Sequence, residues 1–319
     1  MTPDRRILAK TRAIFEERRR MSDSLQLQRQ QALYAACPEI EPIDGALRTL
    51  GVEIARSVFE ADSARRLAEI KARAAELRAD RARLLQKAGL TEPKADACDA
   101  CGDTGYLPDG GFCECFRKEY IRQTLAYLSD RLPAGAFENF KPQMFSSAED
   151  PELGVSPRAA AETNARVMRT FAEKFDSSHE NLYLMGPSSC GKSYLAAAAA
   201  RRAAERGFSV EYQTAFNLCA DFEAQRFGRG DEQTDAAVQA YFDCDLLVLD
   251  DLGCEMNSSF SGPAIYNLLS TRHTAGKSTV ILSELSAAEL SSRYMPQTAG
   301  RIRNDYTNLI FLGGMRRGD

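Results

Sequence analysis

The chain has 319 residues, 44% of them hydrophobic, with 41 Lys+Arg against 45 Asp+Glu and a formal net charge of −4. This length is about twice that of one ordinary domain, so we expect two modules. The composition excludes a mostly disordered chain, a collagen-like repeat and a uniformly basic nucleic-acid coat. No apolar run of the sequence approaches the ~18 residues that cross a bilayer. The N-terminus carries no apolar segment behind its basic residues, so we expect a cytoplasmic protein with no membrane partner.

Residues 1–93 predict a helical region. Apolar residues recur there at three- and four-residue steps, which is typical of amphipathic helices that pack in a short hairpin. Arg81 interrupts the longer stripe. Two alternatives remain for these stripes: the internal core of a helical bundle or an exposed partner surface. The two stripes consist of Leu67, Ile70, Ala74, Leu77 and Leu84, and of Leu47, Leu50, Ile54 and Val58.

Charge is divided unevenly along the chain. Residues 1–90 hold 18 Lys+Arg against 13 Asp+Glu, whereas the remainder holds 23 against 32. The two parts therefore differ in the sign of their charge, and we expect them to have different partners.

Four of the nine cysteines crowd into eighteen residues, at Cys98, Cys101, Cys113 and Cys115. Four thiolates at the two ends of a glycine-rich loop can converge tetrahedrally on one metal ion. Residues 94–130 therefore predict a small Cys₄ zinc module followed by a helix. An iron–sulfur cluster and metal-free thiols are the alternatives. A catalytic zinc is not expected, because four thiolates leave no open coordination position.

Residues 131–157 are rich in proline and glycine and predict a linker. From residue 158 to 319, short apolar runs alternate with helical segments, which predicts an α/β domain with a parallel sheet. The five runs are Asn181–Gly186, Phe208–Gln213, Cys244–Gly253, Ser278–Ser283 and Asn308–Gly314.

A phosphate-binding pattern follows the first of these runs. The sequence Gly186-Pro187-Ser188-Ser189-Cys190-Gly191-Lys192-Ser193 fits G-x-x-x-x-G-K-[ST], and a helix is predicted from Tyr194 onward. The backbone N–H groups of such a loop and the helix N-terminus cradle phosphate oxygens. We expect ATP here, bound by the segment from Gly186 to Tyr194. Lys192 would reach the β- and γ-phosphates and Ser193 would ligate Mg²⁺.

A second pattern lies about 60 residues downstream, where the apolar strand from Asp245 ends in two carboxylates, Asp250 and Asp251. We expect Asp250 to orient the Mg²⁺ shell and Asp251 to polarise the attacking water. Together the two patterns predict an ATPase.

From Phe137 to the C-terminus, the sequence resembles the AAA+ domain of the bacterial DnaC/DnaI helicase loaders and of the related IstB transposition helpers. The segment CDACGDTGYLPDGGFCECF also looks like the cysteine cluster of DnaI-type loaders. The resemblance implies a P-loop AAA+ fold without a C-terminal lid, preceded by a helical domain with a zinc-binding module. The pieces that carry it are FENF (Phe137–Phe140), Ser156–Arg158, NLYLMGPSSCGKSYLA, Cys244–Glu255, Ala264–Arg272 and Leu285–Tyr294.

The resemblance implies self-association through the AAA+ domain, with an arginine from a neighbouring subunit completing the ATP site. Arg301 best matches that position and Arg303 is the second choice. Arg316 or Arg317 matches the near-terminal basic residue that senses nucleotide in the family.

Two positions depart from the family pattern. Ser189 stands where glycine is usual, and Glu284 stands where the sensor strand usually has asparagine. An asparagine side chain can donate a hydrogen bond to the γ-phosphate or to the attacking water, and a carboxylate cannot unless it is protonated. We therefore expect slow hydrolysis, stimulated by a partner or by DNA.

In function, the resemblance implies an ATP-dependent loader that places a hexameric DnaB-type replicative helicase on single-stranded DNA during replication initiation. Residues 1–93 would dock on the helicase. The alternatives are an IstB-like transposition helper, which binds duplex DNA and a transposase, and a nucleotide-switched adaptor with little hydrolysis.

Ala215–Arg229 is the candidate region for DNA contact, because aromatic rings beside arginines can stack bases and neutralise phosphates. The residues concerned are Phe216, Arg226, Phe227 and Arg229. The net acidic charge of this half predicts weak, salt-dependent binding. The alternative is an amphipathic helix with Phe216 and Phe222 facing inward.

Overall fold

The structure is a computed structural model that describes residues 3–57, 63–91, 98–175, 179–256, 258 and 260–313. The chain divides into two compact units. The larger unit combines Met1–Arg12 with Glu114–Asp319, and the smaller unit is Ala13–Cys113.

The larger unit is built on a five-stranded parallel sheet with the strand order β2-β3-β4-β1-β5. Each strand falls within one of the predicted apolar runs or within one residue of it, so the predicted α/β class is confirmed. β4 lies between β1 and β3, which separates the strand before the phosphate-binding pattern from the acidic strand. The strands are β1 (Leu182–Met185), β2 (Val210–Thr214), β3 (Leu246–Leu252), β4 (Ser278–Ser283) and β5 (Thr307–Ile310).

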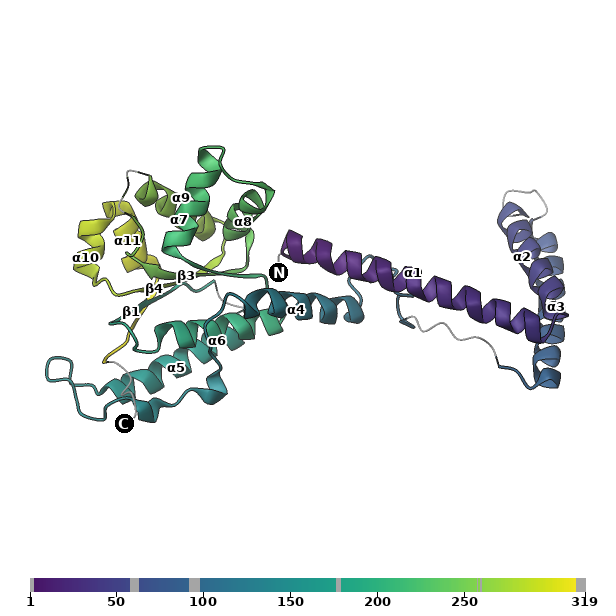
Figure 1. The fold of residues 1–319 in the computed structure, drawn as a ribbon, viewed down its shortest axis with the longest axis horizontal. Helices are drawn as coiled ribbons and strands as arrows, with labels where there is room; N and C mark the ends of the chain where they lie inside the picture. The colour runs from purple at the N-terminus through teal and green to yellow at the C-terminus, as the bar shows by residue number, and fades with distance from the viewer. Residues whose placement is uncertain are drawn as a thin grey trace. The chain divides into compact units, whose positions relative to one another are not determined.

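Helices cover both faces of this sheet (Figure 1). One face is covered by α4 (Glu114–Ser129), α5 (Pro157–Glu173) and α6 (Lys192–Glu205), whose apolar side chains form one buried cluster with the sheet. The other face packs in a second cluster. Its helices are α7 (Ala215–Arg226), α8 (Glu232–Asp243), α9 (Ser261–Thr274), α10 (Ala287–Arg293) and α11 (Pro296–Asp305). Among the described residues, no helix is long and apolar enough to cross a membrane.

The segment predicted as a linker packs against α6. It contains two short 3₁₀ turns, η1 (Phe137–Asn139) and η2 (Pro142–Met144). A Cβ atom at Gly135 would lie 2.3 Å from the carbonyl oxygen of Tyr194, so only glycine allows this close approach to α6. The Tyr194 hydroxyl donates to the Ala136 carbonyl at 3.0 Å, which fixes the same contact. This segment therefore contributes directly to the packing around α6.

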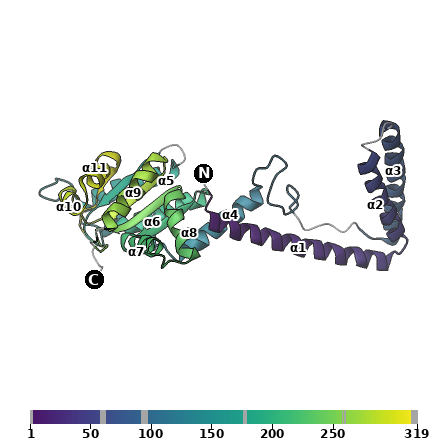
Figure 2. The ribbon, with the colours of Figure 1, turned by 90° about the horizontal axis from the view of Figure 1, so that it is seen from above.

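The smaller unit is helical, as residues 1–93 predicted. α1 (Arg5–Ala36) continues into it from the larger unit, and α2 (Ile40–Ser57) and α3 (Ser63–Ala88) lie side by side (Figures 1 and 2). Two small apolar clusters hold it together, one around Leu50 and Ile70 and one around Ile40. Arg81, which interrupts the predicted stripe, pairs with Asp44 across the hairpin at 2.6 Å, so its position is explained by an ion pair.

Arg272 on α9 is fully buried, and its side chain connects three elements at the amino-terminal ends of β3 and β4. Its guanidinium donates to the carbonyl oxygens of Tyr241 at 2.8 Å, Cys244 at 3.0 Å and Ser278 at 2.5 Å. These carbonyls belong to the end of α8, the turn before β3 and the start of β4. Because buried carbonyl groups are costly when unpaired, this one side chain stabilises the base of the sheet.

Arg272→Met is therefore expected to lower the free energy of unfolding by about 3–5 kcal/mol, because several buried carbonyl groups lose their donor at about 1–3 kcal/mol each. The control is Arg202→Met on α6, where the arginine is half exposed, and its effect is expected within about 0.5 kcal/mol. Urea unfolding curves measure both changes. Equal midpoints for the two variants would contradict the assignment.

A buried carboxylate on β2 anchors the start of the chain. Glu211 pairs with the Arg6 guanidinium and accepts a hydrogen bond from the Tyr127 hydroxyl at 3.0 Å. Its side chain is only 3% exposed. Burial raises the pKa of Glu211 from 4.5 to about 7, against the opposing effect of Arg6.

This shift has a defined pH consequence. Between pH 4.5 and about 7 the unfolded chain has released this proton while the folded chain retains it, so stability falls as pH rises through this window. The free energy of unfolding of the wild type, relative to Glu211→Gln, is expected to fall by up to about 1.4 kcal/mol per pH unit there. The relative stability is flat on either side of the window. Denaturant titrations of both proteins from pH 4.5 to pH 8 test this, and a constant difference would refute it.

Candidate functional site

The phosphate-binding pattern forms a tight loop between β1 and α6. Gly191 caps the helix with φ 92°, a left-handed conformation that favours glycine. Ser189 also lies in the left-handed region, with φ 59°, where a non-glycine residue costs about 1–2 kcal/mol. This gives a physical reason why glycine is usual at that position.

Lys192 is buried at the first turn of α6, with 7% of its surface exposed. Its ammonium group donates to the carbonyl oxygens of Gly186 at 2.6 Å and Pro187 at 2.8 Å. The side chain thus folds back along the loop that it belongs to. From there a positive charge is available on the concave side, where anionic oxygens would lie.

The two predicted carboxylates lie near the carboxyl end of β3. Asp250 is buried and accepts hydrogen bonds from the Ser193 hydroxyl at 3.4 Å and from the Asp251 N–H at 2.9 Å, both on Oδ1. The structure thus brings together the two residues predicted to share one Mg²⁺ ion. Oxygen ligands of this kind suit a hard divalent cation.

Asp251 is exposed and adopts a left-handed backbone with φ 56°, which aspartate tolerates better than most residues. Partial burial and the charges of Asp250 and Glu284 raise the pKa of Asp251, while Lys192 lowers it. The charges of Asp250, Glu284 and Lys192 therefore all act on the carboxylate of Asp251.

Glu284 directly follows β4, the strand between β1 and β3, and its side chain is exposed. The sheet order alone places it between the phosphate loop and the acidic strand, at the same edge of the sheet. Its electrostatic effect on Asp251 supports this placement. The sensor position predicted from sequence thus carries an additional negative charge beside the site.

The predicted finger arginines lie on α11. Arg301 is mostly buried and donates to Asp305 of the same helix at 3.1 Å. Arg303 is exposed and lines a 160 Å³ pocket beside β1 and β5. Arg316 and Arg317 lie outside the described residues. Among the described contacts, neither Arg301 nor Arg303 reaches the phosphate loop of its own chain.

The candidate DNA-contact region forms α7 and the turn after it. Phe222 faces the core, whereas Phe216 is 51% and Phe227 57% exposed, so the alternative in which Phe216 also faces inward is wrong. Arg229 lies over the Phe227 ring at 5.3 Å and Arg226 over the Phe260 ring at 5.6 Å. Exposed rings with adjacent guanidinium groups are the chemistry that binds single strands.

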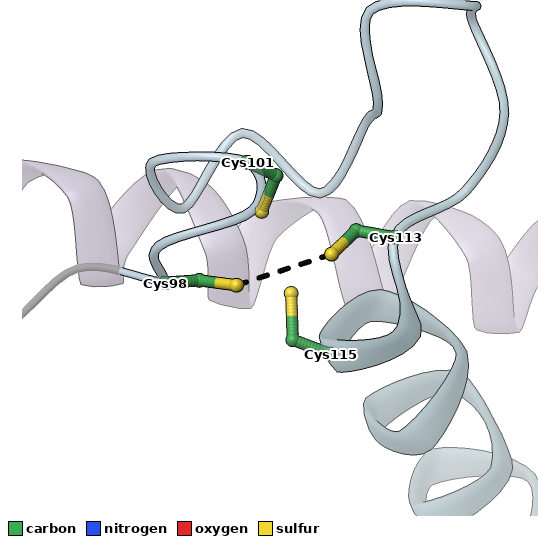
Figure 3. A group of neighbouring side chains, drawn as sticks. All are labelled: Cys98, Cys101, Cys113 and Cys115. Atoms are coloured by element: carbon green, nitrogen blue, oxygen red, sulfur yellow. Dashed lines mark hydrogen bonds between the residues drawn. The ribbon is translucent and has the colours of Figure 1, made fainter.

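The four clustered cysteines converge within one continuous stretch of chain. Their sulfur atoms all lie within 4.8 Å of one another and point toward a common centre (Figure 3). The Cys98 and Cys113 sulfurs are 3.9 Å apart. A tetrahedral zinc with bonds of about 2.3 Å requires sulfur–sulfur distances of about 3.8 Å. The donor set therefore fits one tetrahedral metal ion.

For two further residues near the site, no role was predicted from the sequence. Tyr212 on β2 donates a hydrogen bond to Asp250. Glu255 is buried and accepts hydrogen bonds from the Gly253 N–H and the Tyr294 hydroxyl, which joins the loop after β3 to the end of α10. No spacing rule connects residues this far apart in sequence, so the pattern could not identify them.

A phosphate-binding loop after β1 and acidic residues near the end of β3, with a further strand between them, are the arrangement of a P-loop nucleotide-binding domain. Residues 156–299 match the family described as IstB-like ATP binding protein. This stretch is therefore similar to IstB-like ATP-binding domains.

Two curated relatives are ATP-binding proteins of insertion sequences. One, from Mycobacterium tuberculosis, is 25% identical over 183 residues, covering 57% of this chain and 67% of the relative. The other, from Sinorhizobium fredii, is 31% identical over 121 residues and covers 38% of this chain. The chain spans about half of that second relative, 48% of its length.

Among solved structures, the fold is similar to those of the following two proteins. A crystal structure of the DnaC helicase loader is 19% identical with a TM-score of 0.45, covering 56% of this chain and 97% of that one. A crystal structure of DnaI is 19% identical with a TM-score of 0.44, covering 57% and 90%.

Proposed function

We propose that this protein is an ATP-dependent loader of a hexameric DnaB-type replicative helicase onto single-stranded DNA. The convergence of the four cysteine sulfurs just upstream of the IstB-like domain carries this proposal. The sequence of this cluster resembles that of DnaI-type loaders, whereas IstB-type helpers resemble only the AAA+ part. The helical smaller unit also supports the proposal, because nucleotide binding alone does not require it.

In this proposal the cysteine cluster holds one structural Zn²⁺. The loop from Cys98 to Cys113 has almost no apolar core of its own, so a metal would supply its folding energy. Four thiolates complete the coordination sphere, which makes the zinc structural. Its role is to hold the loop in a fixed shape for a partner.

ATP binding uses the groups already described. Lys192 contacts the phosphates, Ser193 and Asp250 hold Mg²⁺, and Asp251 orients the attacking water. Mg²⁺ supplies charge neutralisation on the phosphate oxygens when it is bound. Arg301 acts on the ATP of a neighbouring copy, which makes self-association part of the catalytic cycle.

Glu284 keeps hydrolysis slow in the absence of partners, because its charge opposes the negative charge that accumulates on the γ-phosphate. Glu284→Asn is expected to raise the ATP turnover number by at least about tenfold, within the effect of one well-placed hydrogen-bond donor. Steady-state phosphate release measures it, with Glu289→Gln on α10 as the exposed control. Equal turnover in Glu284→Asn and the wild type would overturn this explanation.

The smaller unit docks on the helicase. Its helices bury one set of apolar residues, including Leu50 and Ile70, and expose others. Met21 and Leu27 on α1 and Val52 on α2 are each more than half exposed. Apolar side chains next to a basic surface suit a protein partner with an acidic surface.

Native mass spectrometry with the host's replicative helicase tests the proposal. The full chain is mixed with the hexamer, with and without ATP, beside a Cys98→Ser/Cys101→Ser variant and a Cys254→Ser control. We expect a defined complex with the wild type and with the control, and its loss in the double variant. No complex under any condition would refute helicase loading.

The second candidate is an IstB-like transposition helper, favoured by the match of residues 156–299 and by the two insertion-sequence relatives. ATP-dependent binding to duplex DNA together with a transposase, and no complex with the helicase, would establish it in place of the loader. A nucleotide-switched adaptor would form its complex with ATP but show no turnover with or without single-stranded DNA.

A further inference from the structure

Tyr212 lies on β2 beside the acidic strand. In the parallel register Tyr212 pairs with Val248, and Asp250 is the next residue of β3 on the same face. A tyrosine side chain is long enough to span this diagonal. Its ring is buried in the cluster beneath α6, with 6% exposed, and its hydroxyl donates to Oδ2 of Asp250.

The two oxygens of Asp250 are therefore held from different directions. Oδ1 accepts from the Ser193 hydroxyl and from the Asp251 N–H, both of which belong to the site itself. The donor to Oδ2 comes from a strand that contributes no other residue to the predicted nucleotide site. The hydrogen bond of Tyr212 fixes the rotation of the carboxylate about its terminal torsion, which is otherwise broad for aspartate.

We propose that Tyr212 is a positioning residue that orients Asp250 for the Mg²⁺ of the bound nucleotide. Tyr212 acts through its hydrogen bond to Asp250, and the proposal rests on the assigned role of Asp250 as metal ligand. Hydrogen-bonding partners of a metal ligand fix its orientation, and their loss typically costs 10–100-fold in metal affinity. Tyr212 thus acts on metal-dependent binding, and its loss leaves the phosphate-loop contacts in place.

Tyr212→Phe tests this because it keeps the buried ring and removes only the hydroxyl. The matched control is Tyr241→Phe, since Tyr241 is also buried and also donates its hydroxyl to a carboxylate, that of Asp221. Tyr241 packs on the opposite face of the sheet. The readout is binding of a fluorescent ATP analogue to the full chain, titrated with Mg²⁺ and repeated with excess EDTA.

We expect Tyr212→Phe to raise the Mg²⁺ concentration for half-maximal binding at least about tenfold, with unchanged affinity in EDTA. Tyr241→Phe is expected to change neither value. A lowered affinity for the analogue in both conditions would assign Tyr212 a structural role and overturn the proposal, as would an unchanged Mg²⁺ dependence. Because both conditions are measured on the same variant, a loss of stability alone does not imitate the expected result.

Asp250→Asn in the same titration tests the role of Asp250 as metal ligand separately from the role of Tyr212. A wild-type Mg²⁺ dependence in that variant would show that Asp250 is not the ligand, and the role of Tyr212 would fall with it. Helicase loading is tested by complex formation, so its failure would leave this titration unaffected.

Discussion

Lys192→Ala is expected to abolish measurable ATP turnover and to weaken ATP binding by about 10- to 150-fold, the value of a hydrogen bond to a charged group. The buried ammonium group lies against the phosphate loop through Gly186 and Pro187. Removing it takes away the positive charge that would face the β- and γ-phosphates. Binding of a fluorescent ATP analogue and phosphate release measure the two effects.

The matched control is Lys118→Ala on α4, where the lysine is 75% exposed. Its ATP affinity and turnover are expected to equal those of the wild type. Circular dichroism checks the fold of both variants, because the Lys192 side chain also pairs with loop carbonyls. A folded Lys192→Ala protein with wild-type affinity would contradict the assignment of the nucleotide site.

Cys98→Ser/Cys101→Ser is expected to remove bound zinc completely and to unfold the loop around the cluster. The four sulfurs lie within 4.8 Å of one another, and structural zinc contributes about 10–16 kcal/mol of apparent binding energy in small domains. Elemental analysis of the purified protein should give one zinc per wild-type chain and none in the variant. Limited proteolysis should cut the variant between residues 98 and 113.

Cys254→Ser provides the control, since Cys254 is exposed and lies outside the cluster. It should retain one zinc per chain and resist cleavage in that loop. Binding of the ATP analogue reports the fold of the larger unit in all three proteins. Equal zinc content in the wild type and the double variant would remove the cysteines as the metal site, and iron in place of zinc would reassign the cluster.

The predicted nucleotide site could be assembled from sequence because its parts are local. Gly186 to Ser193 are consecutive, and consecutive N–H groups form the phosphate cradle wherever a strand leads into a helix through such a loop. Asp250 could be added because a buried apolar strand that ends in carboxylates is itself a short pattern. The relative position of the phosphate loop and Asp250 could be assigned only from the sheet order, in which β4 separates β1 from β3.

The packing of α7 shows why single side chains were harder to place. Helical spacing allowed Phe216 and Phe222 to face inward together, but only Phe222 is buried. Six residues make about 1.7 turns of helix, which places the two side chains about 120° apart around the helix axis. The width of the neighbouring core decides whether it accepts one or both of them. That width is set by β3, α8 and α9, which lie elsewhere in the chain.

By itself, the sequence determined the five strands, the amphipathic helices, the phosphate loop and the cysteine spacing, because each depends on residues close together along the chain. Only the tertiary structure decided which distant side chains support them. Tyr212 and Asp250 are 38 positions apart, and Arg6 and Glu211 are 205 apart. Such contacts depend on strand register and on which surfaces become buried together. Local propensity and spacing carry no information about either, so these partners became visible only in the folded chain.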